Sequence, residues 1–320
     1  MKLWQGLLCS VSILAGCRNA PPRPTCSTGT QAQSPTPASS GLATPELTND
    51  VPLADDNAGL SFVADGKTLR TLTKAVIRRA FPVETFTVSD AYYDGRPKTW
   101  RAVSLRPLLE RGFEGRTADL DAQQFILRCV DGYTVPLDGK RLLEAGGYLA
   151  LADATVSEWD PIGVKKDNPG PYFVVWKHPD QQGLELHPRP YQLAAIELAA
   201  FETTFPHVAP TGEPTDSAAQ RGFGIFKEQC IRCHAVNQEG GRVGPELNVP
   251  QSIVEYRTDA QLKAFIKNPR TFRYSLMPAH PDLRDTDLAE LLAYFHAMKS
   301  RKHDPNAVKP ARTRNAEKSL

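Results

Sequence analysis

The sequence predicts two folded parts of different class, an α+β part over residues 58–207 followed by an all-helical part over residues 214–301. In the first part, short apolar segments typical of strands alternate with short helical runs. In the second part, two amphipathic helical segments lie on either side of a cysteine motif. The chain has 320 residues, of which 41% are hydrophobic, and this is enough for two domains that each bury a core.

The charge balance excludes one class of partner. The chain has 38 basic and 36 acidic residues and a formal charge of +2, whereas a nucleic-acid-binding protein is normally strongly basic. The surplus is local, because residues 299–320 hold seven Lys or Arg and two acids. We therefore expect no nucleic-acid partner, and we expect residues 302–320 to form a basic disordered tail.

The first 16 residues are typical of a bacterial signal peptide. Lys2 precedes an apolar run over residues 3–16, which is too short to span a bilayer, for which about 20 residues are needed. The run ends in Leu14-Ala15-Gly16-Cys17, which resembles the lipobox of bacterial lipoproteins. This resemblance implies cleavage before Cys17 and acyl chains on its new N-terminus, whereas the alternative is an ordinary signal peptide.

The lipobox resemblance also implies a location on the periplasmic side of a bacterial membrane, with the membrane as a partner through the lipid anchor. Arg18 stands where some inner-membrane lipoproteins have aspartate, and this favours the outer membrane. Residues 17–57 are expected to be a disordered tether. Residues 18–50 contain six Pro, ten Ser or Thr and two Gly, so they cannot bury enough apolar surface to become ordered.

The strongest chemical signal is Cys230-Ile231-Arg232-Cys233-His234. In this C-x-x-C-H spacing two thiols can add to the two vinyl groups of one haem while the adjacent imidazole reaches the iron. A zinc site would usually need a second Cys or His pair, and a thioredoxin-like pair has no use for the histidine. The motif therefore predicts one covalent haem c.

Residues 216–298 resemble class I cytochromes c. Residues 217–229 match the family's N-terminal helix, with Ser217 or Asp216 as its cap. Gly222 and Phe226 match the positions where that helix crosses the C-terminal helix. The expected partner helix spans residues 286–298 and is capped by Asp285 or Thr286.

Two further segments match the family's pattern. Gly244-Pro245-Glu246-Leu247 resembles the G-P-x-L loop, which implies that the Pro245 carbonyl accepts a hydrogen bond from His234; a plain turn is the alternative. Ser275-Leu276-Met277-Pro278 resembles the family's M-P pattern, which implies that His234 and Met277 are the two iron ligands. His280 is the rival of Met277, and an open site is the third option. The domain is neutral, which favours docking of a redox partner protein through an apolar patch at the haem edge.

The α+β part is expected to contain strands at residues 83–89, 124–130 and 172–176 and helices at residues 103–112 and 140–145. The order of its segments resembles the molybdopterin-binding domain of the sulfite oxidase superfamily. The resemblance rests on residues 100–109, 130–136, 149–153 and 170–175.

The cysteine that ligates molybdenum in enzyme members of that superfamily has no counterpart in residues 86–93. Ser89 or Asp90 would be a harder metal ligand than a thiolate. Cys129 lies on the other side of the helical segment from the family's ligand position, so we expect its side chain in the core. We therefore expect no molybdopterin. We expect surface or structural roles for the three histidines of this part, namely His178, His187 and His207. We expect scattered surface charge from its basic residues, namely Arg101, Arg106, Arg128, Lys165 and Lys166.

The sequence therefore favours an exported, lipid-anchored c-type cytochrome that transfers single electrons, rather than a catalyst. The alternative is a molybdopterin-dependent oxidoreductase of the sulfite oxidase type, which passes substrate electrons to the fused cytochrome. A third hypothesis is a ligand-sensing or assembly lipoprotein.

Overall fold

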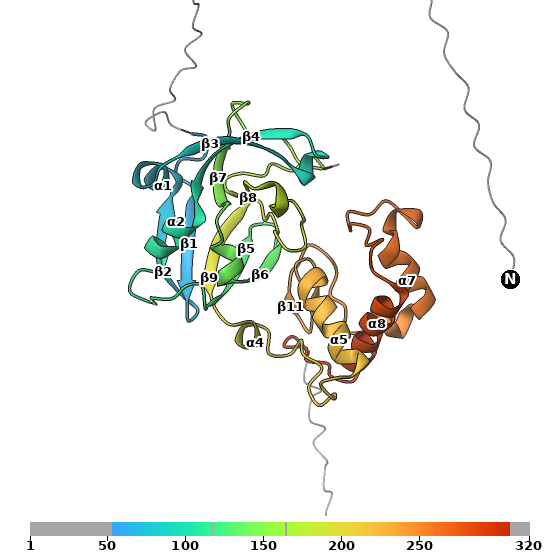
Figure 1. Ribbon diagram of the computed structural model, residues 1–320. Helices are drawn as coiled ribbons and strands as arrows, with labels where there is room; N and C mark the ends of the chain where they lie inside the picture. The colour runs from blue at the N-terminus through green and yellow to red at the C-terminus, as the bar shows by residue number, and fades with distance from the viewer. Residues whose placement is uncertain (1–52, 117, 164, 308–320) are drawn as a thin grey trace, which may run out of the picture. The chain divides into compact units, whose positions relative to one another are not determined.

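The computed structural model describes residues 53–116, 118–163 and 165–307 (Figure 1). The signal peptide, Cys17 and the tether up to residue 52 lie outside the described residues, as does the tail from residue 308. The described residues all belong to one compact unit. None of the helices in this described part is long and apolar enough to cross a membrane.

Two sheets form the framework of the α+β part. The larger has the strand order β2-β1-β9-β5-β6, in which β1 and β9 are parallel and the other neighbours antiparallel. The smaller is antiparallel throughout, in the order β3-β4-β7-β8. The strands are β1 (Gly59–Ala64), β2 (Lys67–Thr73), β3 (Glu84–Ser89), β4 (Pro97–Ser104), β5 (Gln124–Cys129), β6 (Thr134–Asp138), β7 (Gly147–Asp153), β8 (Phe173–Trp176) and β9 (Leu193–Leu198).

The helices of this part are short and differ from the predicted ones. The helix expected from residue 103 begins at Leu105, because Val103 and Ser104 still pair with β7. The helix expected over residues 140–145 is one turn, since the chain turns at Gly146 with positive φ and enters β7. The helices are α1 (Lys74–Ala80), α2 (Leu105–Gly112), α3 (Gly139–Leu142) and α4 (Phe201–Thr204), with 3₁₀ turns η1 (Ala91–Tyr93) and η2 (Pro179–Gln181).

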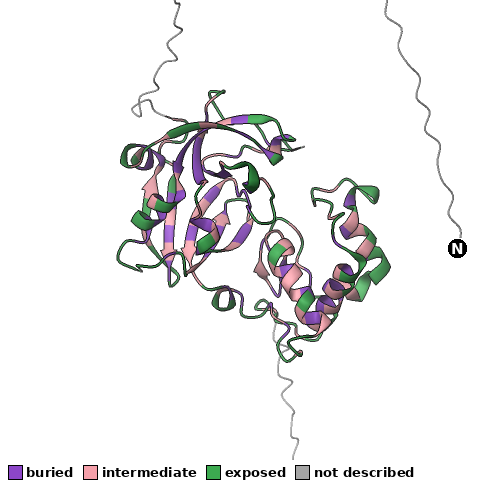
Figure 2. Ribbon diagram, viewed as in Figure 1, coloured by how far each residue is buried: buried purple, intermediate pink, exposed green. Residues whose placement is uncertain are grey.

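One apolar core joins the two sheets. Phe62 of β1, Leu127 of β5 and Leu149 of β7 belong to it together with the buried face of α2 (Figure 2). The other face of the smaller sheet buries a second cluster around Trp100 and Phe173. The alternation of buried faces along the strands explains why both clusters form. The likeness of this fold to the sulfite oxidase superfamily stays a prediction.

The C-terminal part is mainly helical. Ser217 accepts a hydrogen bond from the Gln220 backbone N–H, which confirms it as the first helix's cap. The last helix instead has Arg284 as its cap residue, because the Asp287 carboxylate accepts from the Arg284 backbone N–H. The elements are α5 (Ala218–Ile225), the π-helical turn η3 (Phe226–Cys230), α6 (Ile253–Tyr256), α7 (Asp259–Lys267), the 3₁₀ turn η4 (Pro269–Thr271), α8 (Asp285–Lys299) and the strand pair β10 (Ala235–Val236) and β11 (Glu239–Gly240).

The predicted crossing of the first and last helices is confirmed. A Cβ atom at Gly222 would lie 1.9 Å from the Glu290 carbonyl oxygen, so only glycine lets α5 approach α8 this closely. One turn later, the buried ring of Phe226 packs 5.1 Å from that of Tyr294. The cysteine motif begins at Cys230, directly after this crossing.

Two segments expected to be disordered have ordered ends. Within residues 53–57, Asp56 forms an ion pair with Arg78 at 3.0 Å, and the Ala54 carbonyl accepts a hydrogen bond from Lys74. In the basic tail, the His303 ring stacks on the His207 ring at 3.6 Å. The folded part of the chain thus extends a few residues beyond both expected boundaries.

Candidate functional site

The cysteine motif lies where α5 runs into the π-helical turn η3. The Ile231 backbone N–H donates to the Phe226 carbonyl at 2.9 Å, and the His234 backbone N–H donates to the Cys230 carbonyl at 2.9 Å. Ile231 is fully buried, so the motif is anchored in the core through its second residue. Cys230 and Cys233 are half-buried free thiols, and both remain available for covalent attachment.

His234 is held in one orientation by the loop that follows. Its Nδ1 atom lies 2.9 Å from the Pro245 carbonyl oxygen, which can only accept, so Nδ1 carries the proton. This leaves the lone pair of Nε2 for a metal ion. Burial lowers the pKa of His234, which keeps the ring neutral at pH 7, the form that coordinates iron. The arrangement matches the role that the sequence resemblance implied for Pro245.

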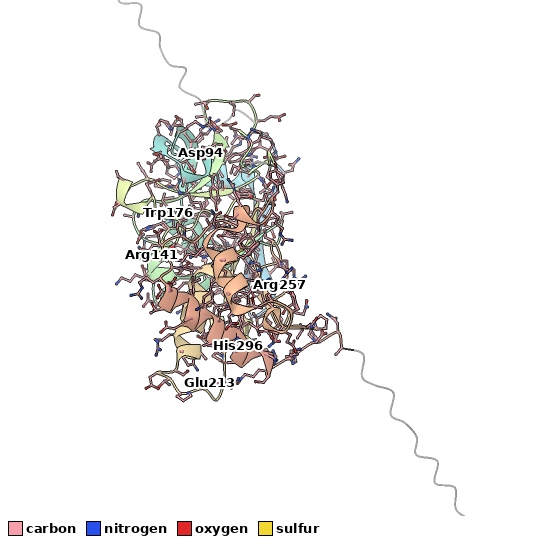
Figure 3. The ribbon with its side chains drawn as sticks, turned by 90° about the vertical axis from the view of Figure 1, so that its right-hand side faces the viewer. Asp94, Arg141, Trp176, Glu213, Arg257 and His296 are labelled. Atoms are coloured by element: carbon pink, nitrogen blue, oxygen red, sulfur yellow. The ribbon has the colours of Figure 1, made fainter. Side chains whose placement is uncertain are left out.

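A cavity of about 420 Å³ opens next to His234. Its walls come from η3, the Pro245 loop, the helices α6, α7 and α8, and the segment between η4 and α8; Arg257 at its rim is labelled in Figure 3. The walls are largely apolar and are formed by Cys230, His234, Pro245, Leu247, Ile253, Tyr256, Arg257, Gln261, Leu262, Phe265, Ile266, Phe272, Arg273, Met277, His280, Leu283, Leu291 and Phe295.

Both candidates for the second iron ligand reach this cavity. Met277 is half-buried and packs against the core of the helical part. His280 also lines the cavity, and its backbone N–H donates to the Ile266 carbonyl at 3.2 Å. The cavity therefore brings together every residue that the sequence proposed for the site except Cys233 and Cys17. The choice between Met277 and His280 stays a prediction.

The residues present fit haem c better than a bare metal ion. Across the described residues, no group of three or more His, Cys, Asp and Glu side chains could hold a metal ion. The site instead offers two thiols, one oriented imidazole and a largely apolar cavity of about 420 Å³. Apolar walls are the usual surroundings of a porphyrin, because they exclude water from the iron.

Sequence reasoning missed the contribution of Arg232, the third residue of the motif. Its guanidinium donates to the backbone carbonyls of Leu184 at 3.0 Å and Glu185 at 2.6 Å. Its own carbonyl accepts from the Thr134 backbone N–H at 3.0 Å. The motif is therefore tied to the α+β part, and no signal in the sequence reveals this, because the two middle positions of C-x-x-C-H are variable in chemistry.

The residues of the α+β part that were considered as metal ligands form contacts with other protein groups. Asp90 and Arg189 are completely buried and form an ion pair at 2.7 Å, and the Ser89 hydroxyl donates to the Gly95 carbonyl. Cys129 lies in the core, as expected, and burial raises the pKa of its thiol far above the ordinary range. Asp90 is therefore already neutralised by a protein cation.

The basic residues of this part divide into two groups. Arg106 pairs with Asp121 and Arg128 with Glu197 at the surface, and Lys165 and Lys166 are exposed, as expected. For Arg101 the expectation of surface charge was wrong, because only 6% of it is exposed. Of the three histidines, His187 is buried beside Glu144 and Arg141, His207 stacks on His303, and His178 precedes η2.

Comparison with known proteins gives one family match, in the helical part, and one curated relative. Residues 217–295 match the family described as cytochrome c oxidase, cbb3-type, subunit III. Cytochrome c oxidase subunit 2 of Alkalihalophilus pseudofirmus is 30% identical over 187 residues, covering 52% of this chain and 53% of the relative. The chain thus spans about half the length of the curated relative that it matches. Together with the site geometry, the family match shows that the C-terminal part is a cytochrome c domain, and such a domain implies haem c.

Proposed function

We propose that this chain is an exported, lipid-anchored cytochrome that carries single electrons through one covalent haem with His234 and Met277 as axial ligands. It acts on the periplasmic side of the membrane, and Arg18 favours the outer membrane. The observation that carries the proposal is the hydrogen bond between His234 and Pro245, which orients the imidazole into the apolar cavity beside Cys230.

Each residue of the site would have its own effect on a bound haem. Haem, when attached, supplies an iron couple that changes by one electron. The Pro245 carbonyl fixes the His234 ring and raises its basicity. The thioether of Met277 is a soft ligand that favours the reduced metal, and the apolar walls disfavour the more highly charged oxidised state. These residues together favour a raised reduction potential.

An apolar rim supports docking to a redox partner protein. Large apolar side chains that are about half exposed or more come from the segments around the cavity, namely Val243, Tyr256, Phe272, Tyr274 and Leu276. Such a rim suits a short-lived complex, since it buries little area and needs no strong charge pairing. The matched family and relative are both named as cytochrome oxidase subunits, which supports a partner in a respiratory chain.

Metal analysis of the purified protein, together with its visible spectrum, tests the proposed function. The proposal expects one iron per chain, a c-type spectrum and no molybdenum. Molybdenum at one atom per chain would contradict a simple carrier and would support the oxidoreductase alternative.

The lipid anchor is tested separately by the variant Cys17→Ala. We expect the wild-type chain to sediment with outer-membrane fractions and the variant not to carry acyl chains, since the acceptor thiol is missing. A wild-type mature chain without acyl chains would contradict the anchor and leave the haem assignment untouched.

A further inference from the structure

Arg101 is a buried cation for which the protein provides no counter-ion. It lies on β4, and only 6% of its surface is exposed. Within the described part of the chain, no carboxylate, carbonyl or hydroxyl lies within hydrogen-bond or ion-pair distance of its guanidinium. By contrast, the buried Arg189 of the same part is paired with Asp90. Arginine stays charged in proteins, so an unpaired buried guanidinium is unfavourable unless something else binds it.

The Arg101 side chain lines a cavity of about 200 Å³ at an irregularity of the smaller sheet. The register between β4 and β7 shifts after Arg101, since Arg101 pairs with Ala152 and Ala102 with Ala150 (Figure 1 shows the two strands side by side). Such an irregularity re-aims side chains and opens the ladder locally. The walls are completed by Leu53, Ala54, Leu151, Ala152, Asp153, Ala154, Val156, Ser157, Glu158 and Trp159.

The acids of the cavity wall do not pair with the guanidinium. Asp153, the buried acid of the wall, is an ion-pair partner of Lys98, which also bonds Asp160 at 3.0 Å. Glu158 is exposed at the rim. A further buried cation, Lys74, lies 5.5 Å from the centre of the Trp159 ring.

Burial also affects the pKa values of the two buried cations. Burial and the nearby Arg78 lower the pKa of Arg101, and burial lowers the pKa of Lys74 to about 8. Both directions are those of buried cations, and at Lys74 the charges of Asp55 and Asp56 act in the opposite direction.

We propose that the cavity beside Arg101 is a binding site for a small anion with two acceptor oxygens in one plane, a carboxylate or an inorganic oxyanion. The planar guanidinium presents parallel N–H groups that match such an oxygen pair. The volume is below the range of cavities that hold drug-sized molecules, so the ligand has only a few non-hydrogen atoms. The site is independent of the haem site and does not rest on the proposed electron carrier.

Calorimetric titration of the haem-loaded protein tests the proposal with acetate, sulfate and phosphate, each against chloride at equal ionic strength. At least one of the three is expected to bind saturably, with one site per chain. Binding of acetate alone identifies a carboxylate ligand, and binding of sulfate or phosphate alone identifies an inorganic one. If none of the three binds more strongly than chloride, the site does not exist as proposed.

Three variants connect such binding to Arg101. Arg101→Gln should weaken binding at least tenfold, whereas Arg111→Gln, which removes an exposed arginine from α2, should leave it unchanged. Val156→Trp should block the entrance from an exposed wall position while the buried charge is kept. Unchanged affinity in both Arg101→Gln and Val156→Trp would overturn the proposal.

Thermal unfolding gives a second readout that does not depend on the variants binding anything. Because the buried charge is unpaired without ligand, Arg101→Met should raise the unfolding midpoint in a buffer free of small oxyanions. The same variant should lose the rise in midpoint that the anion gives the wild type. A lower midpoint for Arg101→Met in the anion-free buffer would show that the guanidinium is already compensated and would contradict the proposal.

Discussion

The imidazole Nδ1 of His234 donates to the Pro245 carbonyl oxygen across 2.9 Å. Gly244 immediately precedes Pro245 in the sequence. A Cβ atom at Gly244 would lie 2.5 Å from Cε1 of the His234 ring. The ring is thus fixed by a hydrogen bond at one edge and by close backbone packing beside it. This pair of constraints positions Nε2 toward the cavity and is the basis of the predictions on the haem site.

Gly244→Ala should displace the His234 ring, because the added methyl group cannot be accommodated without moving it. Overpacking of this kind costs about 1–3 kcal/mol, and we expect a lower unfolding free energy and a lower reduction potential than in the wild type. Both are measured on the purified haem protein by denaturant unfolding and by redox titration.

Gly224→Ala is the matched control, since Gly224 lies in α5 with open space around the position of a Cβ atom. It should stabilise the helix by about 0.5–1 kcal/mol and leave the potential unchanged. Equal potentials in the two variants would contradict the role assigned to the Gly244–Pro245 loop.

Met277→Ala should remove the weak far-red absorption band that is known for ferric haem with His and Met ligands. The thioether lines the cavity and would be lost as a ligand, while the hydrogen bond between His234 and Pro245 remains. Visible spectroscopy of the oxidised protein measures the band, and Met298→Leu, a substitution of a buried methionine in α8, serves as the control. A band that persists in Met277→Ala would show that Met277 is not the ligand, and a wild-type protein without the band would favour His280.

The haem part shows which features a sequence can predict. The cysteine motif, the two crossing helices and the Pro245 loop were predicted because each depends on residues that are close in sequence, or on a glycine with one physical use, as at Gly222. The predicted cap residue of α8, Asp285 or Thr286, was wrong. The helix begins one residue earlier than expected, because the Asp287 carboxylate accepts a hydrogen bond from the Arg284 backbone N–H. The Arg232 contacts were missed because they depend on Leu184 and Glu185, which are distant in the sequence.

Asp90→Asn should destabilise the α+β part by about 3–5 kcal/mol. The amide keeps the acceptor for the Tyr92 backbone N–H but removes the charge that compensates the fully buried Arg189. Denaturant unfolding measures the loss. The matched control is Asp94→Asn at an exposed left-handed position, labelled in Figure 3, where asparagine is equally tolerated and the change should stay within about 0.5 kcal/mol. Equal effects of the two substitutions would show that the buried pair is not what stabilises this region.

Acid should destabilise the α+β part through Glu84. Its hydrogen bond with Lys177 at 2.8 Å holds the pKa of Glu84 below its ordinary value of 4.5. Because the folded state lowers this pKa, the stabilisation is present above about pH 4.5 and is lost as the pH falls through the folded-state value. Glu84→Gln should therefore flatten the fall in unfolding free energy below that pH, and Glu110→Gln, at an exposed position, should not. An unchanged slope in Glu84→Gln would contradict this linkage.

The α+β part shows where prediction from sequence ends. The strands were predicted because they are short runs of mainly apolar residues. The helices expected from residues 103 and 140 were misplaced, since strand pairing of Val103 and the turn at Gly146 override local helical preference. The burial of Arg101 was not predictable, because a basic residue on a strand is usually exposed and its setting depends on the irregular pairing with β7.

Covalent attachment of one haem through Cys230 and Cys233 is the feature on which the proposed electron carrier depends. Mass spectrometry of the denatured, proteolysed protein tests it most directly. We expect a peptide containing residues 230–234 that carries the mass of one haem, and the double variant Cys230→Ser, Cys233→Ser should lack that mass. A peptide with two free thiols from a protein matured with haem present, or a haem removed by denaturation alone, would show that the haem is not covalently bound.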